Sequence, residues 1–155
     1  MASGNGSRKP CVLAIDDDEV CLGFVSAALD SHGYRVLTAI TPQEAIWLYE
    51  EKWREIDVVL LDFLLPPLTG EFVFDELQRL NPGVQVVLLT GCDEPVADTM
   101  FQKGLRGYLK KPFKLADLAQ KVQDAIPAPS VSPASPASKP AAQLQDDKPT
   151  MLSLL

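Results

Sequence analysis

The sequence predicts a doubly wound α/β fold, in which a parallel sheet of five strands is covered by helices on both faces. Three observations support this prediction. Short apolar segments occur at residues 11–15, 34–39, 57–61, 84–89 and 107–110, and they alternate with five amphipathic segments. The connections between them are short, as in α/β units. Several of the apolar segments lack alternating polar residues, which is typical of central strands buried on both faces.

Spacing and capping residues define the first two helices. The first has five residues on one face, namely Cys21, Phe24, Val25, Ala28 and Leu29. Gly33 is suited to end this helix. In the second helix Thr41 is the expected N-cap, Pro42 takes the first position, and Glu44 completes a capping box. Its expected buried face consists of Ala45, Leu48 and Tyr49.

The other three helices follow the third, fourth and fifth strands. One begins near Gly70, turns Phe74 and Leu77 inward, and ends before the Asn-Pro-Gly sequence at 81–83. The next covers about residues 93–103 and is ended by Gly104. The last begins at Lys114, and its predicted apolar stripe consists of Leu115, Leu118, Ala119, Val122 and Ile126.

Composition divides the chain of 155 residues into three parts. Residues 1–9 are predicted to be a flexible N-terminus, and residues 10–126 one globular domain of ordinary size. Residues 127–155 are rich in Pro, Ala and Ser, which favours a disordered tail or linker. The apolar residues in the sequence MLSLL at 151–155 leave two interpretations open, a frayed end or a short docking peptide.

Charge and cysteine content exclude several classes of protein. The net charge of −7 and the pI near 4.6 argue against nucleic-acid binding, which needs clustered Lys and Arg. The N-terminal residues lack the apolar core of a secretory signal, and no apolar run is long enough to span a membrane. Three separated cysteines without a CxxC motif favour a reduced, cytoplasmic protein.

Polar residues stand where the predicted strands end, which in this fold is the ligand-binding edge of the sheet. Asp16 and Asp17 follow the first strand, Asp62 ends the third, Thr90 the fourth, and Lys111 follows the fifth. Clustered carboxylates repel one another, and a hard cation such as Mg²⁺ relieves that repulsion. A metal ion, an ammonium and a hydroxyl can together hold a phosphoryl group, with Asp62 in the middle of the sheet as the nucleophile.

This ordered set resembles the receiver domains of two-component response regulators over about residues 10–126, and that likeness implies the flavodoxin-like receiver fold. By this resemblance Asp62 is the phospho-acceptor and Thr90 and Lys111 assist it. The implied Mg²⁺ ligands are Asp16 (through water), Asp17, Asp62 and the backbone carbonyl of Leu64. Tyr108 matches an aromatic residue that changes rotamer with Thr90 after phosphorylation, although it could equally be a packing residue. Pro112 is expected to be cis, and Gly70 matches the glycine before the third helix.

The resemblance implies a signalling protein that catalyses only its own Mg²⁺-dependent phosphorylation and dephosphorylation. The phosphodonor would be a histidine kinase or a histidine phosphotransfer protein. Phosphorylation would change a protein-binding surface formed by the fourth helix, fifth strand and fifth helix. Three alternatives remain beside a stand-alone regulator: a module of a larger hybrid kinase or effector, a degenerate receiver that acts as a constitutive interaction domain, and an Mg²⁺-dependent phosphatase. The last needs an aspartate where Leu64 stands.

Two positions depart from the pattern of the family close to the chemistry. Leu64 stands where many receivers carry a polar side chain, and Thr69 replaces a common aspartate. The side chain of Leu64 cannot orient a water molecule for attack on the acyl phosphate. We therefore expect slow self-dephosphorylation, with the lifetime set by Leu64 and, across the site, by Cys92.

Overall fold

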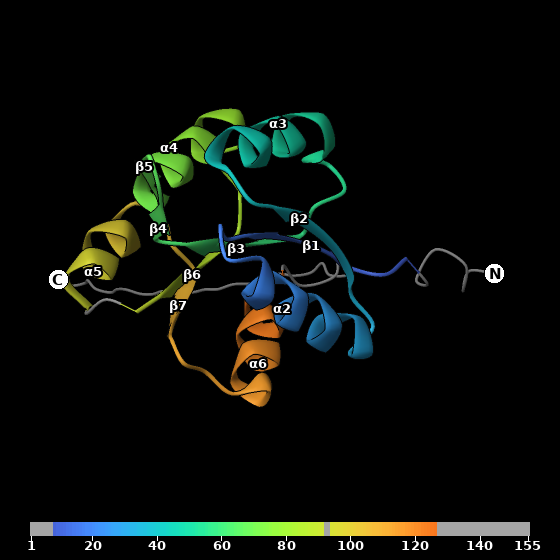
Figure 1. The fold of residues 1–155 in the computed structure, drawn as a ribbon. Helices are drawn as coiled ribbons and strands as arrows, with labels where there is room; N and C mark the ends of the chain where they lie inside the picture. The colour runs from blue at the N-terminus through green and yellow to red at the C-terminus, as the bar shows by residue number, and fades with distance from the viewer. Residues whose placement is uncertain (1–7, 92–93, 127–155) are drawn as a thin grey trace, which may run out of the picture.

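The computed structural model describes residues 8–91 and 94–126, with backbone only for residues 94–97. A parallel sheet lies at its centre (Figure 1). Its strands are β1 (Cys11–Ile15), β2 (Arg35–Ala39), β3 (Val58–Asp62), β6 (Val86–Thr90) and β7 (Gly107–Lys110), in the order β2-β1-β3-β6-β7. The pairing is parallel throughout this sheet, so the carboxyl ends of all five strands meet at one edge.

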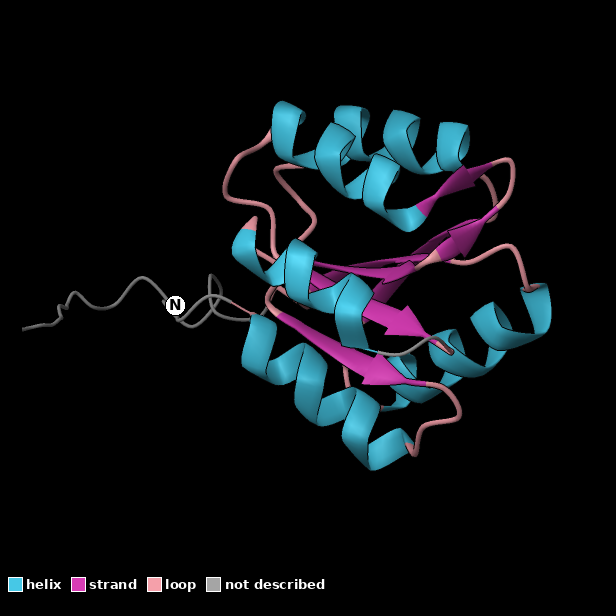
Figure 2. Ribbon diagram, turned by 90° about the vertical axis from the view of Figure 1, so that its left-hand side faces the viewer, coloured by secondary structure: helices cyan, strands magenta, loops and turns pink. Residues whose placement is uncertain are grey.

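Helices cover both faces of the sheet (Figures 1 and 2). One layer consists of α3 (Pro42–Lys52), α4 (Gly70–Leu80) and α5 (Glu94–Gln102), and the other of α2 (Glu19–Ser31) and α6 (Leu115–Ala125). Each layer buries its own apolar cluster. Phe74, Leu77 and Met100 lie in the first cluster, and Leu29 and Leu118 in the second. The predicted α/β fold with five parallel strands and five helices is confirmed.

The order of the strands explains their burial. Every residue of β1, β3 and β6, the three central strands, is buried. The edge strand β2 is mostly exposed or half-buried, which matches its mixed sequence. The strand order reverses direction between β1 and β3, and such a switch is where doubly wound folds bind their ligands.

Two predicted helix faces were wrong in part. Phe24 is 49% exposed, and α2 buries Leu22, Val25, Ala28 and Leu29 instead. Leu115 is 41% exposed, because α6 turns Leu118, Val122 and Ala125 to the sheet. In both helices the buried stripe is therefore rotated away from the predicted one, and one predicted apolar residue faces solvent.

Predicted helix termini are largely confirmed. The Thr41 hydroxyl accepts a hydrogen bond from the Glu44 N–H at 3.0 Å, and Pro42 is the first residue of α3. The Glu44 carboxylate accepts from the N–H of Ile40 at 2.9 Å, one residue before the partner that a capping box requires. Gly33 follows α2 with a φ of +89°, a conformation that favours glycine.

A short antiparallel hairpin between β3 and α4 was not predicted. It consists of β4 (Leu64–Leu65) and β5 (Leu68–Thr69), joined by Pro66 and Pro67. Among the helices that the structure describes, none combines the length and hydrophobicity that crossing a membrane requires. The proposed flexible N-terminus, apart from residues 8 and 9, and the tail at 127–155 lie outside the described residues.

Candidate functional site

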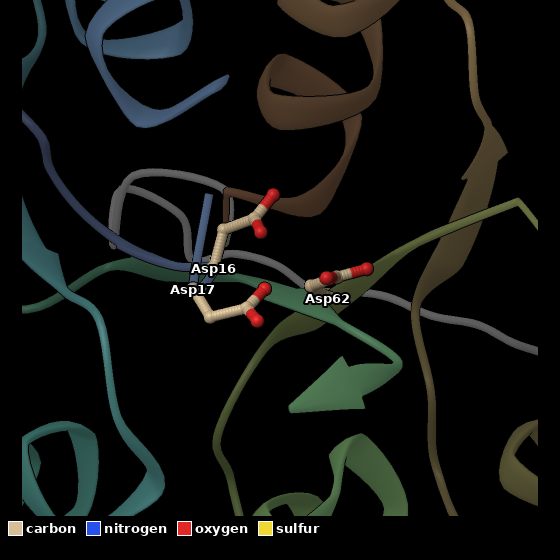
Figure 3. Close-up of side chains that lie close together, drawn as sticks. All are labelled: Asp16, Asp17 and Asp62. Carbon is tan, nitrogen blue, oxygen red and sulfur yellow. The ribbon is translucent and has the colours of Figure 1, made fainter. Parts of the chain in front are cut away.

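Three aspartates meet at the carboxyl edge of the sheet. Asp16 and Asp17 follow β1, and Asp62 ends the neighbouring strand β3. One carboxylate oxygen from each lies within 4.8 Å of the other two, and Figure 3 shows the three side chains gathered above the ends of these strands. Asp16 is 2% exposed and Asp62 is 6% exposed, whereas Asp17 is open to solvent. The site therefore concentrates negative charge, two of its carboxylates being withdrawn from water.

Asp18, the next residue, caps a helix. The sequence alone did not distinguish this role from the roles of Asp16 and Asp17. Its carboxylate caps α2 by accepting from the N–H groups of Val20 and Cys21 at 3.0 and 3.3 Å. Its own N–H donates to the Asp16 carboxylate at 3.0 Å. Asp18 thus joins the start of α2 to the acidic cluster. An aspartate directly before a helical pattern is the signal that could have identified this cap.

Lys111 supplies the positive charge of the site. Its Nζ lies 2.9 Å from Asp16 Oδ2 and 3.4 Å from Asp62 Oδ1. Its backbone N–H donates to the Thr90 carbonyl at 2.8 Å, so the segment after β7 is held against the end of β6. The following peptide bond, Lys111–Pro112, is cis as expected. One ammonium thus faces two buried carboxylates, and the cluster keeps a net negative charge.

Burial and mutual repulsion set the protonation of the cluster. Burial, assisted by the charge of Asp16, raises the pKa of Asp62 to about 6 despite the nearby Lys111. Burial also acts to raise the pKa of Asp16, but the Asp18 N–H and the Lys111 ammonium outweigh it and lower that pKa. For Lys111 burial disfavours the charged form, yet the two carboxylates raise its pKa overall. Asp62 is therefore the carboxylate whose ionisation costs most.

The hairpin and the start of α4 fix the backbone around Asp62. Gly70 donates its N–H to the Phe63 carbonyl at 2.6 Å. A Cβ at Gly70 would lie 2.5 Å from the Asp62 carbonyl oxygen and 2.8 Å from Phe63 Cα. Both are backbone atoms that cannot swing aside, so this close approach requires glycine. The hydroxyl of Thr69 caps α4 by accepting from the Phe72 N–H.

The other residues predicted for the site differ in their position and burial. Thr90 is buried at the end of β6, beside the strand that carries Asp62. Leu64, in the hairpin, is 57% exposed. Tyr108, in β7, is half-buried against the apolar core and meets the ring of Phe101 edge-on, with centroids 6.4 Å apart. Cys92 lies outside the described residues.

The donor set fits a hard divalent cation. Three carboxylates from two adjacent strands converge, and Asp62 is held ionised only at an electrostatic cost. A cation with a preference for oxygen ligands would remove that cost, and these ligands suit Mg²⁺. The same edge also carries the Lys111 ammonium and the buried Thr90 hydroxyl, and groups of these kinds can bind the oxygens of a phosphoryl group.

Comparison with known proteins agrees with this geometry. The sequence pattern of one family, the response regulator receiver domain, matches residues 12–123. This chain belongs to the response regulator receiver family. A receiver domain protein from Clostridium thermocellum has the same fold, with a TM-score of 0.73 and 31% identity over 76% of this chain and 94% of that chain. A response regulator from Burkholderia pseudomallei superposes with a TM-score of 0.67 and 27% identity, covering 74% of this chain and 67% of that chain.

Relatives with assigned roles are longer than this receiver. The sensor kinase CckA of Brucella abortus is 32% identical over 116 residues, which are 74% of this chain and 12% of the kinase. Several further curated relatives are transcriptional regulators, and the matched region spans 27% to 50% of their length. The shared region is thus the receiver itself, and the chain belongs to phosphorylation-based signalling.

Proposed function

We propose that this receiver accepts a phosphoryl group on Asp62 from a phosphohistidine of a histidine kinase or histidine phosphotransfer protein. One observation carries the proposal: Asp62 is a buried carboxylate with a raised pKa, placed between two further aspartates and an ammonium 3.4 Å away. An aspartate that has only a structural role at the end of a strand is normally exposed to solvent or caps a helix. A carboxylate whose ionisation is disfavoured by burial and by a neighbouring charge is typical of a reacting group.

The chemistry assigned to Asp62 is nucleophilic attack on phosphorus. A carboxylate oxygen forms the new O–P bond, the N–P bond to the imidazole breaks, and its electron pair stays on that nitrogen. With a pKa of about 6, Asp62 is mostly ionised at neutral pH and can attack without a separate base. Lys111 Nζ, already directed at Asp62 Oδ1, neutralises charge on the phosphoryl oxygens. The Thr90 hydroxyl provides a further donor.

The residues proposed to hold Mg²⁺ are Asp16, Asp17, Asp62 and the backbone carbonyl of Leu64. When bound, the ion would offset the charge of the carboxylates and draw electrons from the phosphoryl oxygens. Asp16 and Asp62 would each divide their interactions between the ion and Lys111, because Nζ lies 2.9 Å from Asp16 Oδ2 and 3.4 Å from Asp62 Oδ1. In the structure of the Burkholderia response regulator, a phosphorylated aspartic acid and a calcium ion are both present, which supports this proposal.

The proposed output is a change in a protein-binding surface. The predicted fourth helix, fifth strand and fifth helix are α5, β7 and α6 of the structure. Movement of Thr90 toward a phosphoryl group would open space for Tyr108, whose ring now packs edge-on against Phe101 in α5. The partner at this surface is a downstream protein rather than nucleic acid. Because phosphohistidine is made from ATP, the proposed place of action is the cytoplasm.

A second candidate is the same chemistry within a longer protein. The receiver spans between 12% and 50% of its curated relatives, which include a kinase and several transcriptional regulators. In this alternative residues 10–126 are one domain and residues 127–155 a linker to another. Residues in the phosphorylation site would keep the same roles.

The test is Mg²⁺-dependent labelling of the full chain with a small phosphodonor, acetyl phosphate. Wild type should take up one phosphoryl group, and Asp62→Asn should take up none. Asp75→Asn, which removes an exposed carboxylate from α4, is the matched control and should label like wild type. Equal labelling of Asp62→Asn and wild type would refute the assignment of Asp62. A wild-type protein that stays unlabelled would indicate a degenerate receiver.

A further inference from the structure

A groove beside the acidic cluster lies between the start of α2 and the segment that joins β7 to α6. This α2–α6 groove has a volume of about 470 Å³ and is lined by Cys21, Phe24, Lys111, Pro112 and Phe113. The two helices lie side by side on one face of the sheet (Figure 1). Lys111 belongs to both places, since its Nζ lies 3.4 Å from Asp62 Oδ1. The α2–α6 groove therefore borders the proposed phosphorylation site.

Apolar residues that the two helices leave uncovered gather at this groove. Phe24 is 49% exposed, and Val20, one turn earlier on the same face of α2, is 82% exposed. Leu115, 41% exposed, begins α6 two residues after Phe113. Single exposed apolar side chains are ordinary on a protein surface, whereas several around one concavity are typical of a binding surface. The groove is therefore suited to an apolar occupant.

One segment of this chain has the composition of such an occupant. Residues 127–150 are rich in Pro, Ala and Ser and contain no aromatic residue. The sequence MLSLL at 151–155 then supplies Met151, Leu152, Leu154 and Leu155. Their spacing of i, i+1, i+3 and i+4 is that of one apolar helix face, the pattern with which short peptides enter apolar grooves. Residues 151–155 thus match the groove in chemical character.

The intervening segment is long enough to bring these residues to the groove. Residues 127–150 are 24 residues, which span up to about 80 Å at roughly 3.3 Å each. The distance to be covered is the length of α6, 11 residues or about 16 Å, because α6 ends at Ala125 and the groove lies at its start. A short tether gives an effective concentration of about a millimolar, so a weak apolar contact suffices. That advantage favours the chain's own segment over a separate partner.

Charge favours one direction of docking. Asp146 and Asp147 precede the apolar residues 151–155. On the α6 side Lys114 is exposed, and the N-terminus of α6 has no side-chain cap. On the other side α2 begins with the acidic residues Asp18 and Glu19. The acidic pair is therefore attracted toward the start of α6, by Lys114 and by the helix dipole, and repelled from the start of α2.

We propose that residues 151–155 dock in the α2–α6 groove of the same chain, with their leucines against Phe24 and Phe113. The docked segment lies over Lys111, which lines the groove, and so competes with a protein phosphodonor that approaches Asp62 from this side. Docking itself needs no phosphorylation, and only this competition rests on the proposed function. The groove then acts as a self-inhibitory site from which a protein phosphodonor must displace the segment.

The test compares amide signals of the ¹⁵N-labelled full chain in wild type and in the double variant Leu152→Ser/Leu155→Ser. The signals of Phe24 and Phe113 should differ between these two proteins, because the variant leaves the groove open. Leu144→Ser makes the same exchange outside residues 151–155 and should match wild type. Identical signals of Phe24 and Phe113 in the double variant and wild type would overturn the proposal. So would signals that change with protein concentration, which would place the segment in a second copy of the chain.

An added peptide of residues 145–155 measures the competition directly. It should bind the double variant with a dissociation constant roughly two- to tenfold lower than for wild type, whose groove is already occupied. In the double variant, a further Phe24→Ala should weaken this binding at least tenfold. Phe72→Ala, which truncates a similarly exposed phenylalanine on α4, should not weaken it. Equal binding to the Phe24→Ala and Phe72→Ala proteins would refute the assignment of the groove.

Docking and phosphorylation can fail separately. In Asp62→Asn the serine exchanges at 152 and 155 should still change the signals of Phe24 and Phe113, because docking does not use the carboxylate of Asp62. A wild-type chain that takes no label from acetyl phosphate but shows these changes would refute the proposed function and keep the docking. A chain that takes label but shows no changes would refute the docking alone.

Discussion

Replacing Asp62, the proposed phospho-acceptor, should stabilise the metal-free protein. The pKa of Asp62 is raised from its usual 3.8 to about 6, mainly by burial and then by the charge of Asp16. The difference is roughly two pKa units, and each unit corresponds to about 1.36 kcal/mol, so the ionised carboxylate costs about 3 kcal/mol at pH 8. Asp62→Asn keeps the volume and removes the charge. We expect its free energy of unfolding to exceed that of wild type by roughly 1–3 kcal/mol at pH 8.

The sign of the pH dependence follows from the direction of the change in pKa. A carboxyl group whose pKa is raised by folding binds its proton more tightly in the folded state. Wild type is therefore favoured at low pH and loses stability as pH rises from 3.8 through about 6. Between pH 5 and pH 8 the free energy of unfolding of Asp62→Asn should rise relative to that of wild type by roughly 1 kcal/mol, because the other carboxyl groups titrate in both proteins.

Urea unfolding in the presence of EDTA, followed by circular dichroism at pH 5 and pH 8, measures this difference. Asp17→Asn is the matched control, since it removes the same charge from the same cluster at an exposed position, and should change stability less. Added Mg²⁺ should stabilise wild type and thereby reduce or reverse the difference in free energy of unfolding between Asp62→Asn and wild type. Equal stability of Asp62→Asn and wild type at pH 8, or a lower stability of the variant at both pH values, would refute the electrostatic reasoning.

Three further predictions concern the surroundings of Asp62. Gly70→Ala should cost about 1–3 kcal/mol in urea unfolding, because its Cβ would meet backbone atoms; Gly23→Ala, in open space on α2, should instead gain up to about 1 kcal/mol. Leu64→Asn should shorten the lifetime of the acyl phosphate roughly tenfold in a phosphate-release assay, since an amide can orient water; an unchanged lifetime would contradict this. Tyr108→Ala should label at the wild-type rate, while the amide signals of α6 no longer respond to acetyl phosphate; a retained response would exclude the switch.

In the proposed phosphorylation site, neighbouring residues have different structural roles. Asp18 caps α2 and donates to Asp16, while Lys111 is tied to Thr90 through the backbone and to Asp16 through its side chain. The charged groups are thus positioned by the ends of secondary structure elements rather than by one another alone. Such anchoring keeps the groups in place when the charge at Asp62 changes, as it would on phosphorylation.

Much of the fold followed from local rules in the sequence. Consecutive apolar residues in β1, β3 and β6 indicated buried parallel strands, and alternation with amphipathic segments indicated the layers. Thr41 and Gly33 marked helix ends because capping involves residues close together in the chain. The parallel arrangement then required that polar residues at successive strand ends share one edge, which predicted the meeting of Asp16, Asp17 and Asp62.

Other features depend on contacts between distant residues, and no local pattern contains them. The exposure of Phe24 and Leu115 reflects how each helix is rotated on the sheet. The need for glycine at position 70 comes from the backbone of Asp62 and Phe63, which the hairpin brings close. A cavity of about 420 Å³ exists where the end of α3, the start of β3 and the turn before β6 meet. The sequence by itself therefore determined which residues are proposed to carry the phosphoryl chemistry. Only tertiary packing decided the burial that raises the pKa of Asp62, because burial depends on all the elements around it.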